Sequence, residues 1–140
     1  MNPLFFYRLG CILKKYHIPL LPRICEGLTF LVFNSSIPLA CTIGEGTTFE
    51  HRGIGIVINR DTTIGKDCVI QTHVVMGGGG RIPGAPVIKN NVYIGTGAKI
   101  IGGVTVGDNA VIGANAVVIS DIPPNALAVG VPAKVKKLGK

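Results

Sequence analysis

A six-residue repeat dominates this sequence. From residue 64 onward, every sixth position carries an aliphatic residue or methionine: Ile64, Ile70, Met76, Ile82, Ile88, Ile94, Ile100, Val106, Ile112 and Val118. Small or β-branched residues recur four places after these positions: Cys68, Val74, Val92, Ala98, Val104, Ala110 and Ala116. An earlier stretch with Ile37, Ile43 and Phe49 keeps the same step and then slips by three residues before Ile58. Such a hexapeptide repeat predicts a parallel β-helix.

In a β-helix each hexapeptide forms a short strand and a tight turn, and no strand buries its apolar side alone. Stacked coils point the large aliphatic residues inward from three faces, while the small residues let the corners close. Glycine or asparagine at the turns is expected to supply left-handed backbone angles easily. The residues assigned to this role are Gly65, Asn90, Asn91, Gly107, Asn109, Gly113 and Asn115.

The composition fits one folded β domain and excludes several other classes. Hydrophobic residues make up 47% of the 140 residues and charged residues 15%, which excludes a disordered, charge-driven chain. Twenty glycines and nine prolines disfavour a helical bundle. The net charge of +7 would suit nucleic acid, a membrane surface or an anionic cofactor. Nucleic acid is not an expected partner, because no stacking aromatic residues accompany a basic groove.

Two segments depart from the plain repeat. Residues 3–33 carry amphipathic patterns on either side of Pro19 and Pro22, which predicts two short helices. Residues 77–86 keep the count of six, but five glycines and two prolines make a poor strand, so we expect a loop thrown out from one coil. The predicted domains are a short helical N-terminal segment, residues 1–35, and a β-helix domain with a basic C-terminal tail, residues 36–140.

Neither the cysteines nor the histidines have the spacing of a metal site. Buried thiols in a reducing cytoplasm are expected for Cys11, Cys25, Cys41 and Cys68. No metal is expected, because a three-histidine zinc site needs other spacings than those of His17, His51 and His73. The apolar N-terminus lacks the basic region and cleavage site of a signal peptide, and no apolar run is long enough to span a membrane. A cytoplasmic location is therefore expected.

Several segments resemble bacterial serine O-acetyltransferases, a branch of the hexapeptide-repeat acyltransferases. Residues 49–58 contain Glu-His-Arg-Gly-Ile-Gly-Ile-Val, which resembles the family's Asp-His-x-x-Gly-Ile-Val segment. Residues 70–78 resemble its Gln-Ser-Val-Thr-Leu-Gly-Gly run, and residues 93–102 and 128–134 look like its coenzyme A coils. The resemblance implies an all-β fold, a left-handed parallel β-helix, acetyl-CoA as cosubstrate, and a homotrimer with active sites in clefts between neighbouring β-helices.

The resemblance also implies site residues. His51 is the expected general base, since the pKa of imidazole lies near the working pH. Glu50 aligns with the acidic residue beside the family's histidine and is expected to contact the acceptor or help set the imidazole. Gly77 and Gly78 are candidates for the oxyanion site, because glycine lets the backbone approach a thioester closely.

Coenzyme A is expected to bind further along the chain. The residues that the resemblance places along its pantetheine arm are Thr96, Gly97, Ala98 and Ala114. Lys134 leads a basic end suited to the phosphates of coenzyme A, which continues with Lys136, Lys137 and Lys140.

The acceptor side departs from the family pattern. Ser36 aligns with the aspartate that orients the catalytic histidine, and Gly84-Ala85 align with the Arg-His pair that holds serine. His73 replaces a serine and is expected to line the acceptor pocket. About 33 residues precede the β-helix here, where the family carries a large helical domain. These differences predict a sugar hydroxyl of a polysaccharide or lipopolysaccharide precursor as the acceptor, with L-serine as the alternative.

A third alternative belongs to another class. A non-catalytic β-helix could act as a scaffold or at a membrane surface, since the apolar N-terminal segment carries four basic residues, Arg8, Lys14, Lys15 and Arg23. Packing of this segment on the β-helix is the preferred interpretation, and membrane contact is not expected.

Overall fold

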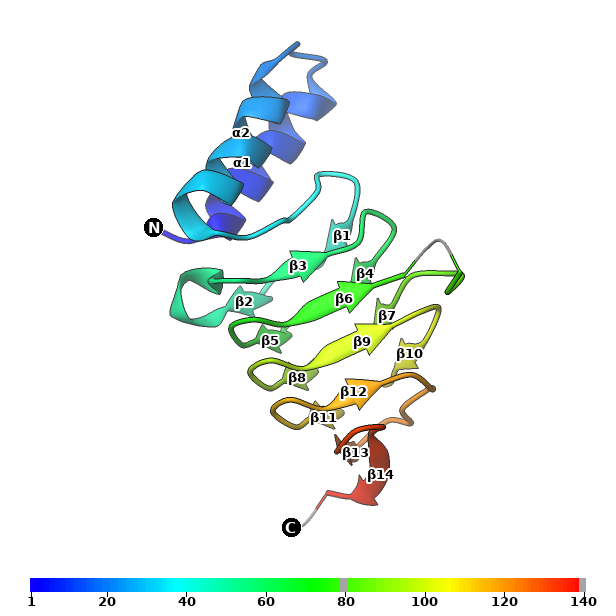
Figure 1. The fold of residues 1–140 in the computed structure, drawn as a ribbon. Coiled ribbons are helices and arrows are strands. Elements are labelled where there is room, and N and C mark those ends of the chain that lie inside the picture. The colour runs from blue at the N-terminus through cyan, green and yellow to red at the C-terminus, as the bar shows by residue number, and fades with distance from the viewer. Residues whose placement is uncertain (79–80, 139–140) are drawn as a thin grey trace.

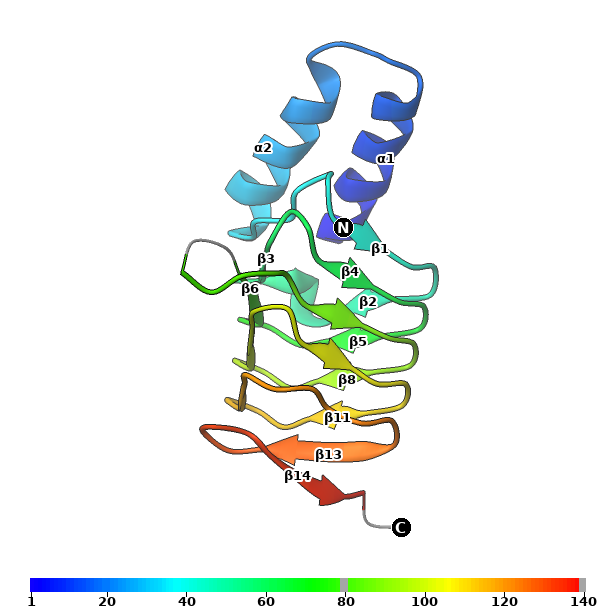
Figure 2. The same cartoon turned by 90° about the vertical axis from the view of Figure 1, so that its right-hand side faces the viewer.

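The computed structural model describes residues 1–78 and 81–138, in which two helices stand at one end of a three-sided β-helix (Figure 1). Seen after a quarter turn, the strands of successive coils lie one below the other (Figure 2). The parallel β-helix that the repeat predicts is confirmed, and so is a helical N-terminal segment.

Each side of the β-helix is one sheet. Face 1 contains β1 (Thr42–Ile43), β4 (Thr63–Ile64), β7 (Val87–Ile88) and β10 (Thr105–Val106). Face 2 contains β2 (Thr48–Phe49), β5 (Val69–Ile70), β8 (Tyr93–Ile94), β11 (Val111–Ile112), β13 (Ala126–Val129) and β14 (Lys134–Lys137). Face 3 contains β3 (Val57–Ile58), β6 (Val75–Gly77), β9 (Lys99–Ile101) and β12 (Val117–Val118). All neighbouring strands pair parallel except β13 and β14, which pair antiparallel.

The recurring aliphatic residues form the core. Ile70, Met76 and Ile94 have no exposed surface, and the small residues between strands, such as Ala98 and Ala116, are equally buried at the corners. Partner residues on successive coils, such as Ile70 and Ile94, stand in register, so each coil covers the apolar side of the next.

The first interruption of the repeat lies between β2 and β3. Phe49 pairs with Ile70, and Val57 pairs with Val75, so the upper coil needs three more residues than the lower one to cross the same corner. The slip of three in the sequence is therefore confirmed, and its cause is a longer turn at one edge of the β-helix.

The second interruption is the loop of residues 78–86 between β6 and β7, of which residues 79 and 80 lie outside the described residues. The glycines and prolines of this segment predict a loop, and that prediction is confirmed. Ile82 belongs to this loop and is 50% exposed, so its assignment to the inward series is wrong. The count of six is met there, but the prolines and glycines prevent the strand that would point the side chain inward.

Three of the seven residues expected at left-handed angles adopt them, and they are Asn91, Asn109 and Asn115. The side chains of Asn91 and Asn109 form a ladder that continues to Asn125: the Asn91 amide donates to Asn109 Oδ1 (2.8 Å), and the Asn109 amide donates to Asn125 Oδ1 (3.0 Å). The expectation is wrong for Gly65, Asn90, Gly107 and Gly113, which have no positive φ. At Gly65, glycine is needed for another reason, since a Cβ there would lie 2.6 Å from the Lys89 carbonyl oxygen of the next coil.

The N-terminal segment is a hairpin of α1 (Pro3–Lys15) and α2 (Leu21–Phe33), which confirms two helices separated at the prolines. The hairpin packs on the first coil, as expected, and the buried Tyr7 joins the core of the β-helix. Tyr7 and Arg8 donate hydrogen bonds to carbonyl oxygens of that coil, those of Cys41 (2.7 Å), Ile43 (2.9 Å) and Gly44 (2.7 Å).

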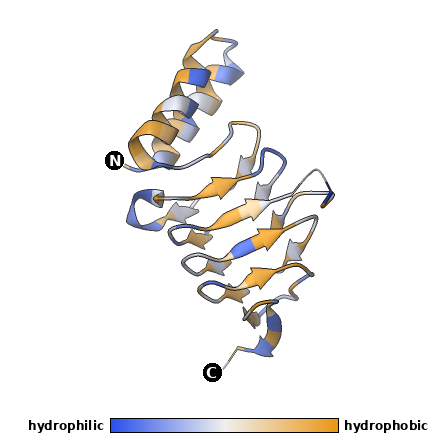
Figure 3. Cartoon of the chain, viewed as in Figure 1, coloured by the Kyte–Doolittle hydropathy of each residue, from blue (hydrophilic) through white to orange (hydrophobic). Residues whose placement is uncertain are grey.

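Hydrophobic residues make up much of the hairpin (Figure 3), and several of their side chains are exposed. Phe5 is 61% exposed and Leu31 is 79% exposed. Within residues 1–78 and 81–138, neither helix has the length and hydropathy needed to cross a membrane.

Replacing Ile94 by alanine is expected to lower the free energy of unfolding by about 2–5 kcal/mol, because it leaves a cavity inside the coil. Ile119 is 59% exposed, so Ile119→Ala is a matched control and should change that free energy by less than about 0.5 kcal/mol. Denaturant unfolding followed by circular dichroism measures both variants. Equal losses would contradict the inward register of face 2.

Stability should fall at alkaline pH. Burial, with a smaller effect of the nearby Cys11, raises the pKa of the Cys41 thiol from 9.0 to about 12. Because this pKa is higher in the folded than in the unfolded chain, its contribution to stability is complete below about pH 9 and is lost as the pH rises toward 12. Burial raises the pKa of Tyr7 as well, which acts in the same direction. Thermal melts across this range should show a shallower decline for Cys41→Ala than for the parent protein, and identical slopes would exclude Cys41 as a cause.

Candidate active site

The candidate catalytic histidine lies on the longer turn between β2 and β3. This turn is a short 3-10 segment, η1 (Glu50–Gly53), in which His51 and Arg52 have left-handed backbone angles (φ 48° and 61°). Residues other than glycine rarely adopt such angles, and those that do gather at functional sites. Both side chains are exposed, so both are accessible to a ligand.

The base of the turn is fixed although its tip is exposed. The hydroxyl of the buried Ser35 donates a hydrogen bond to the Gly53 carbonyl oxygen. The Asn2 side-chain amide donates to the Phe49 carbonyl oxygen (3.2 Å), immediately before the turn. Pro3 lies against Gly53, where a Cβ would come within 2.8 Å of the proline ring. The start of α1 and the residue before the first coil therefore hold both ends of the turn.

Ser36, which aligns with the family's orienting aspartate, does not contact His51 by a hydrogen bond in the described part of the chain. Its N–H donates to the Ile56 carbonyl (2.8 Å), and its own carbonyl accepts from Ile58 (2.9 Å), so its backbone extends face 3 by one bridge. Glu50 is half-buried and accepts a long hydrogen bond from Thr48 (3.4 Å). The turn thus positions the backbone of His51 and leaves its ring free of both neighbours.

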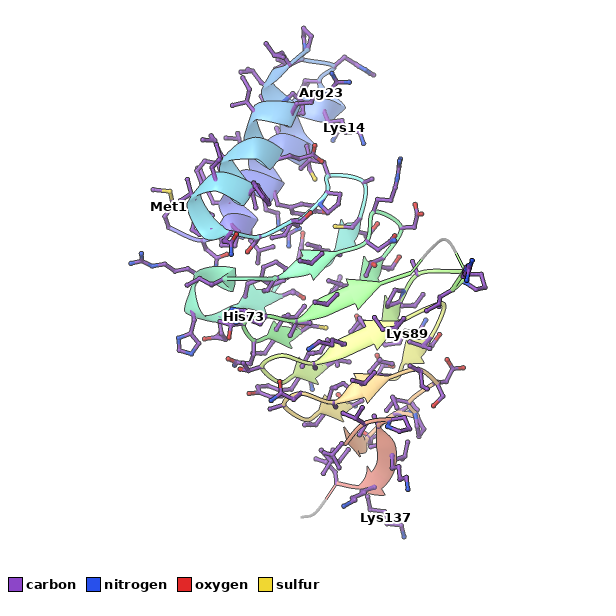
Figure 4. The ribbon with its side chains drawn as sticks, viewed as in Figure 1. Met1, Lys14, Arg23, His73, Lys89 and Lys137 are labelled. Atoms are coloured by element: carbon purple, nitrogen blue, oxygen red, sulfur yellow. The ribbon has the colours of Figure 1, made fainter. Side chains whose placement is uncertain are left out.

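His73 lies at the same edge, one coil below the turn (Figure 4). Its N–H donates to the Ile54 carbonyl (2.9 Å), and its imidazole lies so close to Gly55 that a Cβ there would be 2.5 Å from the ring. The edge between faces 2 and 3, which we call edge 2–3, carries a column of residues with positive φ: Gly55, His73, Gly97 and Asn115. The structure therefore brings His51 and His73 to neighbouring coils of one edge.

Edge 2–3 continues over the small residues predicted to hold coenzyme A. Thr96 and Ala114 are exposed there, and the Gly97 N–H donates to the Thr72 carbonyl of the coil above (2.9 Å). Ala98 has no exposed surface, so its side chain is not accessible to a ligand, unlike the sequence prediction. The reason is the repeat itself, because Ala98 occupies the inward corner position.

Gly77, Gly78 and Ala85 lie elsewhere, at the opposite end of β6, on the edge between faces 3 and 1 (edge 3–1). The Gly78 carbonyl accepts a hydrogen bond from the Asn59 side chain (2.9 Å), which fixes the start of the loop. Five residues of extended chain separate Gly78 from His73, which corresponds to roughly 15 Å. Within one chain, the predicted oxyanion glycines and His51 are thus on opposite edges of face 3.

The basic end lies far from the hairpin. Lys134, Lys136 and Lys137 belong to β14 and are exposed, and Figure 4 shows Lys137 at the end of the β-helix opposite the helices. Lys140 lies outside the described residues. In residues 1–78 and 81–138, no three side chains of the metal-ligating types lie close enough to share an ion.

One hollow adjoins the turn of His51. Its volume is about 370 Å³, and its lining residues are Met1, Val32, Phe33, Arg52 and Ile54. Two larger hollows lie away from the turn, one of about 470 Å³ beside Lys89 and Pro124, and one of about 630 Å³ between the hairpin and Leu39.

Three residues at the turn were not predicted from the sequence: Asn2, Ser35 and Arg52. Asn2 before Pro3 is a recognisable helix N-cap, but its second bond, to the turn, depends on tertiary structure. Ser35 and Ser36 are indistinguishable by residue type, and only packing decides that Ser35 is the buried one. Arg52 could have been noticed as a large residue within the slip of the repeat.

Comparison with known proteins agrees with this architecture. Residues 85–120 match the family model described as bacterial transferase hexapeptide (six repeats). The chain is 39% identical over 136 residues to a serine acetyltransferase of Helicobacter pylori strain J99, a match that covers 96% of this chain and 79% of that protein. It is 34% identical over 131 residues to the serine acetyltransferase of Synechococcus elongatus, covering 92% of this chain and 53% of that protein.

Solved structures agree as well. The Neisseria gonorrhoeae serine acetyltransferase in complex with serine matches with a TM-score of 0.86 and 32% identity, covering 94% of this chain and 54% of that chain. A serine acetyltransferase in complex with CoA gives a TM-score of 0.85 and 35% identity, covering 96% and 55%. The fold and the repeat define a hexapeptide-repeat transferase. Within that class the chain belongs to the serine acetyltransferase family, and it spans about half the length of the Synechococcus elongatus relative and of these solved structures.

Ser35→Ala is expected to lower the free energy of unfolding by about 1 kcal/mol, because the Gly53 carbonyl loses the Ser35 hydroxyl and keeps only the longer bond from the Ile56 N–H (3.3 Å). Ser36→Ala is the matched control, since the adjacent side chain is exposed, and should stay within about 0.5 kcal/mol of the parent protein. Chemical denaturation of both variants gives the comparison. A larger loss in Ser36→Ala would show that the wrong serine has been assigned to the turn.

Proposed function

We propose that this protein is an acetyl-CoA-dependent O-acetyltransferase, which moves an acetyl group from a thioester to a hydroxyl. The observation that carries the proposal is the placement of His51, whose backbone is fixed by the turn while its side chain is exposed at the head of edge 2–3. The small residues of that edge and a relative solved with CoA support coenzyme A as the donor.

In the proposed reaction, the His51 imidazole accepts the proton of the acceptor hydroxyl while the hydroxyl oxygen attacks the carbonyl carbon of the thioester. The carbonyl oxygen becomes an oxyanion, which the backbone N–H groups at Gly77 and Gly78 would stabilise. Collapse of the tetrahedral intermediate breaks the carbon–sulfur bond, and the imidazolium gives its proton to the leaving thiolate. His51 ends neutral, and Glu50 beside it is proposed to contact the acceptor.

The proposed site needs a second copy of the chain. His51 and the Gly77–Gly78 segment lie on opposite edges of face 3, so a neighbouring copy whose edge 3–1 faces this edge 2–3 would bring them together. This arrangement supports the homotrimer that the resemblance implies, with one site in each cleft. Coenzyme A would extend along edge 2–3 toward Lys134.

The relatives change the order of the candidate acceptors. The departures from the family pattern favour a sugar hydroxyl, but the relatives described above are named serine acetyltransferases, and one is solved with serine. L-serine is therefore our first candidate, to be bound near His73. A sugar hydroxyl remains the second, because Ser36 and Ala85 stand where the family has charged residues that serve the serine reaction.

Three further expectations from the sequence stay predictions. They are the domain boundary between residues 35 and 36, the cytoplasmic location, and the preference for an enzyme over a scaffold or membrane-surface module. The membrane-surface alternative rests on the exposed apolar residues of the hairpin. Binding of coenzyme A would argue against a non-catalytic scaffold.

His51→Asn is expected to lower kcat at least about 100-fold while coenzyme A binding is retained, because asparagine accepts a positive φ but cannot act as the base. The assay is release of free thiol from acetyl-CoA with L-serine and with a panel of sugars. Serine-dependent release would support the first acceptor, and release only with a sugar would support the second.

The control is His17→Asn, which changes the same residue type at a positive φ in the hairpin connection, remote from the turn. It should keep parental turnover. Equal turnover in His51→Asn and in the control would overturn His51 as the base.

A further inference from the structure

We propose that Arg52 binds the carboxylate of the acceptor, so that the site selects a hydroxy amino acid. This inference deepens the proposed function and rests on it. Arg52 follows His51 directly, and their Cα atoms are about 3.8 Å apart. Both side chains are exposed on the same turn, so we expect one small molecule to contact both of them.

The backbone of Arg52 gives the first argument. Its φ of 61° and ψ of 21° lie in the left-handed region, which glycine adopts more easily than any residue with a Cβ. A glycine would thus fit this turn better than an arginine. The turn therefore keeps an arginine at a position where the backbone conformation favours glycine.

The surroundings of the side chain give the second argument. Arg52 contributes the charged side chain to the hollow of about 370 Å³, whose other lining residues are Met1, Val32, Phe33 and Ile54. Phe33 is buried, whereas Met1, Val32 and Ile54 are exposed, so the guanidinium lies beside an apolar surface that is open to solvent. In residues 1–78 and 81–138, no hydrogen bond or ion pair engages the guanidinium, and the ion pair that occurs there joins Arg60 and Asp61 (3.9 Å).

Charge and position favour a carboxylate over the phosphates of coenzyme A. The hollow is lined by Met1 and by two residues of the hairpin, Val32 and Phe33, whereas the residues proposed for coenzyme A lie in the other direction along edge 2–3. Glu50, two residues before Arg52, adds a negative charge that disfavours a dianion and suits the ammonium group of a zwitterion. A planar guanidinium also matches the two oxygens of a carboxylate.

The opposite side of the proposed site lacks a cation at the expected place. Gly84 and Ala85 carry no charge, although they align with the family's Arg-His pair. Arg81 is the cation of the loop of residues 78–86 and is exposed, so it is the rival of Arg52 for the same carboxylate. The experiment must separate these two arginines.

The test is calorimetric binding of L-serine and of L-serinamide, which keeps the hydroxyl and the ammonium group but lacks the carboxylate. The parent protein should bind L-serine roughly 10- to 100-fold more tightly than L-serinamide, the range of a charge-assisted hydrogen bond. Arg52→Gly should abolish this preference, and Arg52→Lys should restore part of it. The KM for acetyl-CoA should stay unchanged, and the melting temperature of Arg52→Gly should be equal or higher.

Two further variants complete the design. Arg60→Gly removes an exposed arginine away from the turn and should keep the preference. Loss of the preference in Arg81→Gly but not in Arg52→Gly would overturn the proposal, as would a parent protein that binds both ligands equally. Carboxylate-dependent binding without any thiol release would contradict the proposed function and leave this inference standing. Thiol release without carboxylate preference would support the proposed function and overturn this inference.

Discussion

Each coil of this β-helix covers the apolar side of the coil above it, because partner residues such as Ile70 and Ile94 stand in register with their side chains inward. Shifting a strand by one residue would turn that side chain to solvent, so the coils tolerate no irregularity within a face. Extra residues are accommodated only at the edges, between strands. Both interruptions of the repeat, the turn of His51 and the loop of residues 78–86, lie at such edges, and both carry candidate functional groups.

The helical hairpin packs on the first coil and also fixes the turn that carries His51. Asn2 and Pro3, at the start of α1, contact the two ends of the turn, and Ser35, after α2, binds its Gly53 carbonyl. These contacts explain how two successive residues keep unfavourable backbone angles, since such angles persist only where the surrounding structure fixes them. The hairpin thus holds the proposed catalytic residue in place without contributing a side chain that reacts.

The division of the candidate site over two edges follows from the geometry of a three-sided β-helix. His51 precedes face 3 in one coil, and Gly77 ends face 3 in the next, so the width of the face separates them. A chemistry that needs both groups therefore favours assembly over a single-chain site. The same geometry places Arg52 on the hairpin side of the turn and the small residues proposed for coenzyme A on the other side.

The sequence alone determined the β-helix, its core residues, the two helices, both interruptions and the family, because a period of six and a few motifs are local properties of the chain. It failed at Ile82, where the count of six continues without a strand, and at Gly65, where close contact between coils and not backbone angle requires glycine. Tertiary structure alone decided that Ser35 and not Ser36 holds the turn, and that Arg52 lines a hollow beside His51. Those features depend on which surfaces meet across coils and against the hairpin, and residue order by itself does not specify such contacts.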